Sequence, residues 1–233
     1  MNDRDLDEIL RQAGGAPQPV EPDLLERISG SIRSSLHPVR PMLPAWVLTS
    51  FLILTCEAVA IAGAAKLGLY GIEKMNAREI GLIFPVLGIF TLLAAMLSVG
   101  EMTPGGRRRV TPVALLSGGS LLLVAVFALL FNDYRVDHFM AQGVPCLAAG
   151  LLHALPAGLA SWLLLRRGFA VNPVSAGLAA GTLAGLAGVT MLELHCANLQ
   201  AIHVIVWHTA VLVVSGLVGA LSGRATRAWV RRL

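Results

Sequence analysis

Long apolar stretches separated by short polar segments dominate the chain from residue 44 onward. Six of these stretches reach the length of about 20 residues that a helix needs to cross the hydrocarbon core of a bilayer. They cover residues 44–67, 78–100, 112–131, 140–165, 173–193 and 202–222. The pattern predicts an all-α fold: a polytopic membrane protein whose residues 41–223 form a bundle of six transmembrane helices.

Residues 1–40 follow a different pattern, in which short amphipathic runs are separated by glycine and proline. Apolar residues recur at helical spacing in two runs, with Leu6, Ile9 and Leu10 in the first and Leu25, Ile28, Ile32 and Leu36 in the second. Gly14 and Gly15 end the first run, and Pro22 suits the first position of the second helix. We expect two short helices joined by an extended linker, and no signal peptide, because this segment lacks an apolar core.

This N-terminal segment is also acidic. Seven of the 14 acidic residues of the chain fall within the first 26 positions, among them Asp5, Asp7 and Glu8. Helices shorter than about 12–15 residues are marginal in water, so we expect these acids and the apolar stripes to bind a partner protein. The alternative is a helix lying on the membrane surface, although such helices usually carry a basic polar face.

Composition and charge placement support the membrane assignment and orient it. The chain is 55% apolar and 14% charged, whereas about 25% of the residues of a soluble domain are charged. Arginines precede the first span, occupy the loops at 107–109 and 166–167, and fill a basic tail at 224–233. The positive-inside rule places these segments and both termini in the cytoplasm. Because topology explains the basic residues, the net charge of +4 does not indicate nucleic-acid binding.

Glycines repeat along the fifth stretch, at Gly177, Gly181 and Gly185. A face of small residues lets another helix approach closely. The pattern favours static packing inside the bundle, and a homodimer interface is the alternative.

Two ionisable residues lie near the middle of predicted spans, Glu57 in the first and His153 in the fourth. Such residues mark substrate or proton pathways by default. A small transporter or channel that uses Glu57 and His153 is therefore one function hypothesis, and a locally hydrogen-bonded pair is the structural alternative.

Cysteine and histidine residues concentrate where the predicted topology reaches the outer boundary of the membrane. Cys146 opens the fourth span, and Cys196 follows the fifth. A disulfide between them, unlinked cysteines, and a metal site with His195, His203 or His208 all remain open. Spacing disfavours the metal site, because residues five apart, such as His203 and His208, are separated by about 140° on a regular helix. A haem bound by His203 or His208 and His153 is a further alternative.

The motifs "GVPC", "LRRG", "ELHC" and "VWH", together with the acidic head and six spans, resemble the NrsF-like membrane anti-sigma factors. The chain departs from the common pattern at Ala197, where many relatives have proline after the second cysteine.

The resemblance implies a bacterial inner-membrane protein that holds an extracytoplasmic-function (ECF) sigma factor inactive. It also implies that the N-terminal head binds the sigma factor and that Cys146 and Cys196 sense oxidation. We expect no cofactor. The sequence contains no phosphate-binding loop, nucleophile elbow or metalloprotease helix, so we do not expect an enzyme.

Overall fold

The computed structural model describes residues 8, 22–35, 43–102, 110–166, 168 and 172–230. The chain divides into two compact units, Met1–Pro41 and Met42–Leu233. The first expected helix, with Leu6, Ile9, Leu10, Asp5 and Asp7, lies outside the described residues, and so does Leu36. Glu8 is described and exposed.

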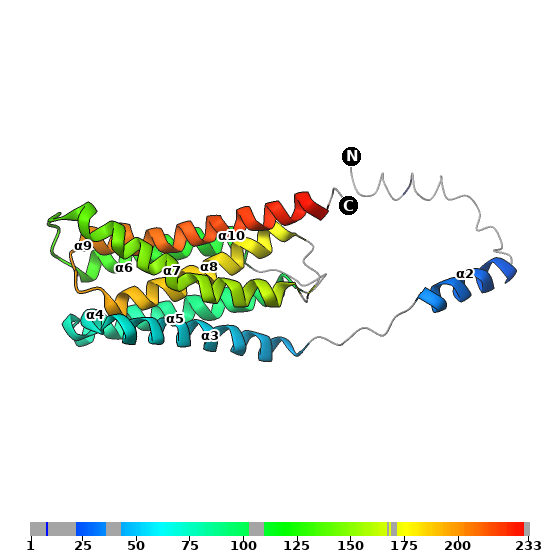
Figure 1. The fold of residues 1–233 in the computed structure, drawn as a ribbon, viewed down its shortest axis with the longest axis horizontal. Coiled ribbons are helices and arrows are strands. Elements are labelled where there is room, and N and C mark those ends of the chain that lie inside the picture. The colour runs from blue at the N-terminus through cyan, green and yellow to red at the C-terminus, as the bar shows by residue number, and fades with distance from the viewer. Residues whose placement is uncertain are drawn as a thin grey trace. The chain divides into compact units, whose positions relative to one another are not determined.

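In the first unit, α2 runs over Pro22–Ser35 (Figure 1). Asp23 lies in its first turn, where a carboxylate is favoured by the helix dipole, and forms an ion pair with Arg27 one turn later (3.5 Å). The apolar stripe of α2 is exposed: Leu25, Ile28 and Ile32 have exposed fractions of 55%, 46% and 54%.

The second unit is a bundle of long helices, and it contains no strand among the residues that the structure describes. Its helices are α3 (Ala45–Leu67), α5 (Ala77–Gly100), α6 (Pro112–Leu130), α7 (Phe139–Leu165), α8 (Pro173–His195) and a continuous last helix made of α9 (Ala201–His203), η1 (Val204–His208) and α10 (Thr209–Val230). Six helices are long and apolar enough to cross a membrane. The chain is a multi-pass membrane protein, as its hydropathy pattern predicts.

The starts of these helices follow from local side-chain chemistry. Asn76 caps α5 by accepting hydrogen bonds from the backbone N–H groups of Arg78 and Glu79, and Glu79 accepts in return from the backbone N–H of Asn76. Thr111 and Asn172 also cap α6 and α8 by accepting hydrogen bonds from backbone N–H groups of the first turn. Each of these two caps is followed by a proline, which is tolerated at the first helical position because that N–H has no intrahelical partner.

The last helix is longer than its apolar stretch. We expected the span to end near residue 222 with a separate basic tail, whereas α10 continues to Val230. Arg224 and Arg227 are good helix formers, and cations near a helix C-terminus interact favourably with its dipole. The bundle begins with α3 and finishes with α10 at the same end (Figure 1).

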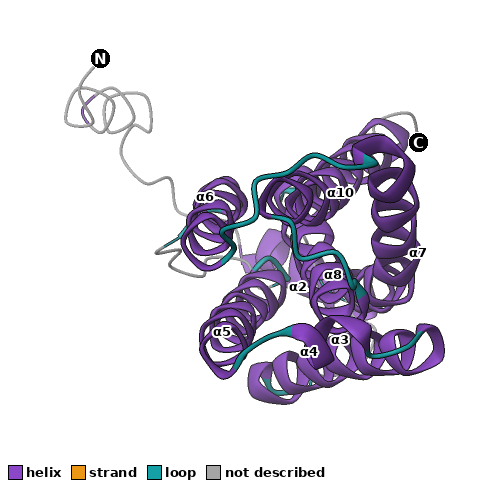
Figure 2. Cartoon of the chain, turned by 90° about the vertical axis from the view of Figure 1, so that its left-hand side faces the viewer, coloured by secondary structure: helices purple, strands orange, loops and turns teal. Residues whose placement is uncertain are grey.

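Helix α8 lies at the centre of the bundle, surrounded by the other helices (Figure 2). Its apolar stretch is 83% buried, compared with 22–44% for the other five spans. The glycine face of α8 packs on α10 within the same chain: added Cβ atoms on Gly177 and Gly181 would collide with the backbone of Gly219 and Ser215. This face is therefore an internal packing surface.

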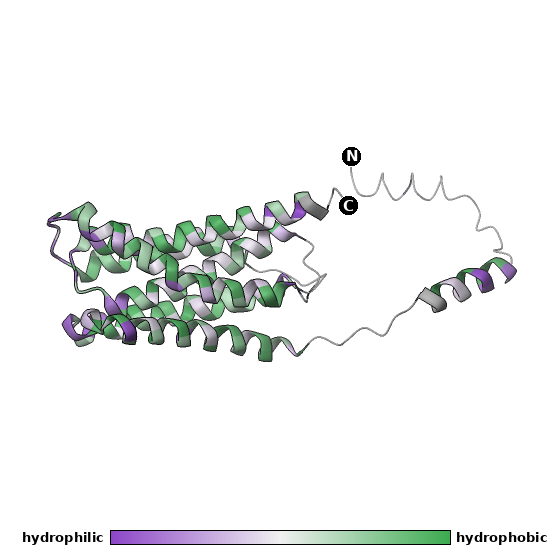
Figure 3. Cartoon of the chain, viewed as in Figure 1, coloured by the Kyte–Doolittle hydropathy of each residue, from purple (hydrophilic) through white to green (hydrophobic). Residues whose placement is uncertain are grey.

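The outward faces of the surrounding helices are apolar, as expected for contact with lipid. Trp46, Leu121 and Leu129 expose 72%, 71% and 74% of their surface. Figure 3 shows apolar residues along the length of the bundle, with polar residues gathered toward its ends. We call the end formed by α4 (Tyr70–Lys74) and the segments 131–138 and 196–200 the distal end; it is opposite to the end where α3 begins.

Candidate functional site

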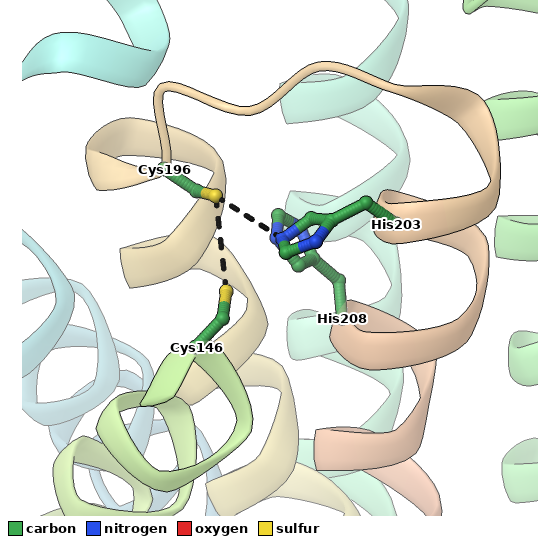
Figure 4. Close-up of side chains that lie close together, drawn as sticks. All are labelled: Cys146, Cys196, His203 and His208. Carbon is green, nitrogen blue, oxygen red and sulfur yellow. Dashed lines mark hydrogen bonds between the residues drawn. The ribbon is translucent and has the colours of Figure 1, made fainter. Parts of the chain in front are cut away.

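Two cysteines and two histidines from three parts of the chain meet at the distal end (Figure 4). Cys146 lies in α7, Cys196 is the C-cap of α8, and His203 and His208 are the last residues of α9 and η1. One ligand atom from each residue lies within 4.8 Å of those of the other three. We call these four residues the Cys–His cluster.

Sulfur and nitrogen atoms are in contact within the Cys–His cluster. The Sγ atoms of Cys146 and Cys196 are 3.8 Å apart, and the Nε2 atom of His203 lies 3.5 Å from Cys196 Sγ. The rings of His203 and His208 meet edge to face with centroids 5.7 Å apart. Three members are buried and Cys196 is partly exposed.

A local irregularity of the last helix brings the two histidines together. Val204–His208 form a π-helical turn, in which hydrogen bonds join residues i and i+5. The wider turn brings residues five apart closer to the same side of the helix than the about 140° that separates them on a regular α-helix. The premise on which the spacing disfavoured His203 and His208 as a pair is therefore wrong, because the helix is not regular at this point.

Close packing of glycines places the two cysteines. Gly143 of α7 leaves room for the indole of Trp207, which also packs against Phe139 in a tilted arrangement, with ring centroids 5.1 Å apart. Cys146 follows Gly143 by three residues and so faces the same neighbour. On the other side, Gly71 of α4 packs on the backbone of Glu193 and Cys196, and a Cβ on Gly71 would lie 3.0 Å from the Cys196 carbonyl oxygen.

The electrostatic setting of Cys196 favours a thiolate. The hydrogen bond that Cys146 donates holds the pKa of the Cys196 thiol well below its ordinary value, and the hydrogen bond with His203 acts in the same direction, against the effect of partial burial. A thiolate is the form of cysteine that acts as a nucleophile and as a metal ligand. Of the two thiols, Cys196 is the one whose pKa is lowered and whose side chain is partly exposed.

Sequence reasoning missed Glu193, which extends the Cys–His cluster inward. Its Oε1 atom lies 2.6 Å from His208 Nδ1, and the two side chains are 0% and 1% exposed. One signal was present in the sequence: Glu193 is the only acidic residue after Asp137. An isolated acid three residues before Cys196, at the end of an apolar stretch, marks a side chain that must find a buried partner.

A cavity of about 760 Å³ reaches the Cys–His cluster from the distal end. Cys146, Cys196 and His203 form part of its lining, together with the polar side chains of Lys74, Asp137, Gln142, Asn198 and Gln200. Asn198 donates a hydrogen bond to Gln142 (2.6 Å) and so ties the segment after α8 to α7. The cavity gives small solutes a route to the two sulfur atoms.

The other candidate residues lie apart from the Cys–His cluster. His195 turns away from it and pairs its Nδ1 atom with the carbonyl oxygen of Gly68 (2.9 Å). His153 stands seven residues after Cys146, about 10 Å deeper along α7, pairs with the carbonyl oxygen of Ala149 (2.9 Å) and packs on Gly63.

Glu57 is half-buried and lies six residues before Gly63, about 9 Å along α3 from the ring of His153. The structure therefore does not bring Glu57 and His153 together.

Comparison with known proteins identifies the family. The model of the NrsF family, described as negative regulator of sigma F, matches residues 33–229. No curated protein and no solved structure matches the chain. The family is one of regulators and not an enzyme class, and its description implies negative regulation of a sigma factor. Since the match spans most of the 233 residues, the chain belongs to the NrsF family.

Proposed function

We propose that this protein is a bacterial inner-membrane anti-sigma factor that holds an ECF sigma factor through residues 1–40 and releases it when the Cys–His cluster is oxidised. The observation that carries the proposal is the contact of the Cys146 and Cys196 sulfurs at 3.8 Å, beside His203 and at the end of a cavity. Arginine-rich segments at the opposite end support a cytoplasmic location for both termini and an outer location for the distal end.

The N-terminal unit has the chemistry of a protein-binding segment. Leu25 and Ile28 of α2 are about half exposed, which leaves an apolar stripe available to a groove. The segment around them is acidic. The DNA-binding surfaces of a sigma factor are basic, because they contact phosphates, so an acidic amphipathic helix complements them. Leu6, Ile9, Leu10, Asp5, Asp7 and Leu36 belong to the same proposal.

The chemistry of the signal is thiol oxidation. Forming a disulfide requires the two sulfurs to close from 3.8 Å to about 2.05 Å. The two thiols lose two electrons and two protons to an oxidant such as a peroxide or a quinone. With a peroxide, the Cys196 thiolate attacks one oxygen atom, because its pKa is lowered and it lines the cavity; the O–O bond breaks, and an alcohol or water leaves. The Cys146 sulfur then attacks the resulting sulfenic acid of Cys196, the S–O bond breaks, water leaves and the disulfide forms. An oxidising compartment outside the membrane allows the disulfide to persist.

Packing contacts link the Cys–His cluster to α4 and α3, the part of the bundle that follows the head in the chain. Cys196 ends α8, and Gly71 of α4 rests on the backbone of Glu193 and Cys196. Helix α4 follows α3, whose beginning is joined to the N-terminal unit. Movement of Cys196 toward Cys146 would displace the support on which α4 rests and shift α3.

Energetics set the scale of the switch. Moving a bound population from 99:1 to 1:99 requires a differential interaction of about 5.5 kcal/mol. A disulfide contributes about 2–4 kcal/mol. The disulfide therefore supplies part of the required free energy, and repacking of α3 and α4 against α8 must supply the remainder.

A promoter reporter tests the redox part. In cells that contain the sigma factor, we expect oxidant to activate the target promoter with the wild-type protein and to have no effect with Cys146→Ser or Cys196→Ser. Cys56→Ser is the matched control, because Cys56 is buried in α3 against the Leu183 carbonyl oxygen. An oxidant response that survives both substitutions would contradict the redox part.

Co-purification tests the head. We expect the full-length protein to retain the sigma factor and Leu25→Asp or Ile28→Asp to lose it. Leu24→Asp is the matched control, since Leu24 is also exposed but points about 100° away from Leu25 around the helix. Retention of the sigma factor by the Leu25→Asp and Ile28→Asp variants would contradict this assignment.

The cluster geometry favours a second candidate signal, a soft metal ion. Two sulfurs and two imidazole nitrogens within 4.8 Å of one another match the ligand types and number of a tetrahedral site. Thiolate ligands select soft cations such as Cu⁺, Zn²⁺ or Cd²⁺. Promoter activation by such an ion under reducing conditions, lost in Cys146→Ser and His203→Phe but not in His195→Phe, would favour the metal over the oxidant.

A further inference from the structure

Glu193 and His208 form a buried carboxylate–imidazole pair directly behind the Cys–His cluster. Their side chains are almost fully buried, and the Oε1 to Nδ1 distance is 2.6 Å. A carboxylate removed from water needs a hydrogen-bond donor or a cation beside it. The contact joins Oε1 of Glu193 to Nδ1 of His208, so Nδ1 is the ring nitrogen that the carboxyl group holds.

This arrangement leaves the second ring nitrogen, Nε2, for the Cys–His cluster. A neutral imidazole with its proton on Nδ1 carries a lone pair on Nε2. The Nε2 atom of His208 is buried and has no hydrogen-bond partner among the residues that the structure describes. His208 contributes one of the four ligand atoms that converge within 4.8 Å. With Nδ1 held by Glu193, Nε2 is the nitrogen left for that role.

The helix geometry holds the pair in place. Glu193 lies in the last turn of α8, and His208 is the last residue of the π-helical turn η1. The ring of Phe127 meets His208 edge-on, with centroids 6.4 Å apart, and limits rotation of the imidazole. Without the carboxylate, either ring nitrogen of His208 could carry the proton.

We propose that Glu193 is a positioning residue: it fixes the tautomer of His208 so that Nε2 presents its lone pair to the Cys–His cluster and completes a site with two sulfur and two nitrogen ligands for a soft divalent cation. The inference rests on the metal candidate under the proposed function. Metal-bound histidines commonly donate their other ring N–H to a carboxylate, which orients the ring and raises the basicity of the ligand.

The decisive variant is Glu193→Gln. Glutamine has the shape of glutamate, but its amide can either accept from Nδ1 or donate to it. The variant therefore keeps the packing and loses the preference for one tautomer. Glu57→Gln is the matched control, because it makes the same chemical change on α3 at a carboxyl group remote from the Cys–His cluster.

The test uses the full-length protein in lipid nanodiscs under reducing conditions. Nitrogen-15 NMR of labelled histidine, assigned with His208→Phe, reports the tautomer of His208 without metal. Titration with Cd²⁺, followed by thiolate absorption and by cadmium-113 NMR, reports affinity and the ligand set. For the wild-type protein we expect a proton on Nδ1 of His208 and a cadmium shift typical of two sulfur and two nitrogen ligands.

For Glu193→Gln we expect mixed tautomers and a Cd²⁺ affinity about 10–100-fold lower, the usual effect of losing such a partner. Glu57→Gln should behave as wild type. A wild-type His208 protonated on Nε2, unchanged affinity in Glu193→Gln, or a wild-type protein that binds no Cd²⁺ would each overturn the proposal. If Glu193→Gln does not fold, the tautomer of wild-type His208 still decides the outcome.

Failure of this inference is distinguishable from failure of the proposed function. Co-purification and the promoter response report sigma-factor binding and release, and they do not depend on the tautomer of His208. A wild-type protein that releases its sigma factor on oxidation but binds no Cd²⁺ would remove the metal role and leave the redox function standing.

Discussion

The bundle contains two combinations of a glutamate and a histidine, and they differ in almost every physical respect. Glu193 and His208 are nearly inaccessible and 2.6 Å apart. Glu57 and His153 are half-buried, and the ring of His153 packs on Gly63, about 9 Å along α3 from Glu57. Only the first combination adjoins the cysteines at the distal end.

The difference shows what brings intramembrane polar residues together. A carboxyl group and an imidazole within the bundle form a pair only when tertiary packing places them side by side, as it does for Glu193 and His208. His153 satisfies its Nδ1 atom locally, through the carbonyl oxygen of Ala149. The Nδ1 atom of His208 instead pairs with Glu193, which lies 15 positions earlier in the chain and on another helix. This contact couples the Cys–His cluster to the central helix α8.

The largest expected difference concerns stability. Substituting His208→Leu leaves the Glu193 carboxylate buried without its partner, and breaking a buried pair costs about 3–5 kcal/mol. His153→Leu removes one local hydrogen bond and should cost about 1 kcal/mol. Unfolding of the detergent-solubilised variants would measure both. The double variant Glu193→Leu/His208→Leu should recover most of the lost free energy of unfolding. Equal losses in His208→Leu and His153→Leu would contradict the distinction between the two glutamate–histidine combinations.

A second difference concerns thiol reactivity. Because the pKa of Cys196 is lowered by Cys146, its thiolate persists as the pH falls below the ordinary cysteine value of about 8.5. At pH 6 we expect iodoacetamide to label Cys196 and not the buried Cys56, as measured by mass spectrometry. Cys146→Ala should raise the pKa of Cys196 and slow labelling about tenfold per unit of that rise. Labelling unaffected by Cys146→Ala would contradict this assignment.

The smallest effect is expected at Glu57. Substituting Glu57→Gln should change the free energy of unfolding by less than about 0.5 kcal/mol, because Glu57 is half-buried and remote from His153. It should leave the promoter response to oxidant unchanged. Loss of that response would place the function at Glu57 and His153 instead of at Glu193 and His208. An ion flux through liposomes that Glu57→Gln abolishes would support the transporter hypothesis.

Several features were predictable because they depend on local sequence. The apolar stretches predict the long helices, since each span satisfies its own backbone hydrogen bonds in lipid. Because Cys146 begins the fourth span and Cys196 follows the fifth, the order of the spans places both cysteines at the same end of the bundle. The structure brings their two sulfurs into contact. Helix starts at Asn76, Thr111 and Asn172 follow from capping chemistry.

The geometry of the Cys–His cluster was not predictable in the same way. A hydrophobic pattern does not show a π-helical turn, because residues 201–228 are apolar on most faces and give no helical register. The pairing of Glu193 with His208 joins two helices, and spacing along one helix says nothing about it. Likewise, the separation of Glu57 from His153 depends on the depth at which α7 packs on α3.

The sequence by itself therefore determined the membrane bundle, the acidic amphipathic head and the presence of two cysteines at one end, because hydropathy, charge and helix capping act over a few residues. Only the tertiary structure decided which polar groups meet. Close approach of glycine-lined helices to α8 places Cys196, His208 and Glu193 within reach of one another, and such contacts arise from the packing of helices far apart in the chain.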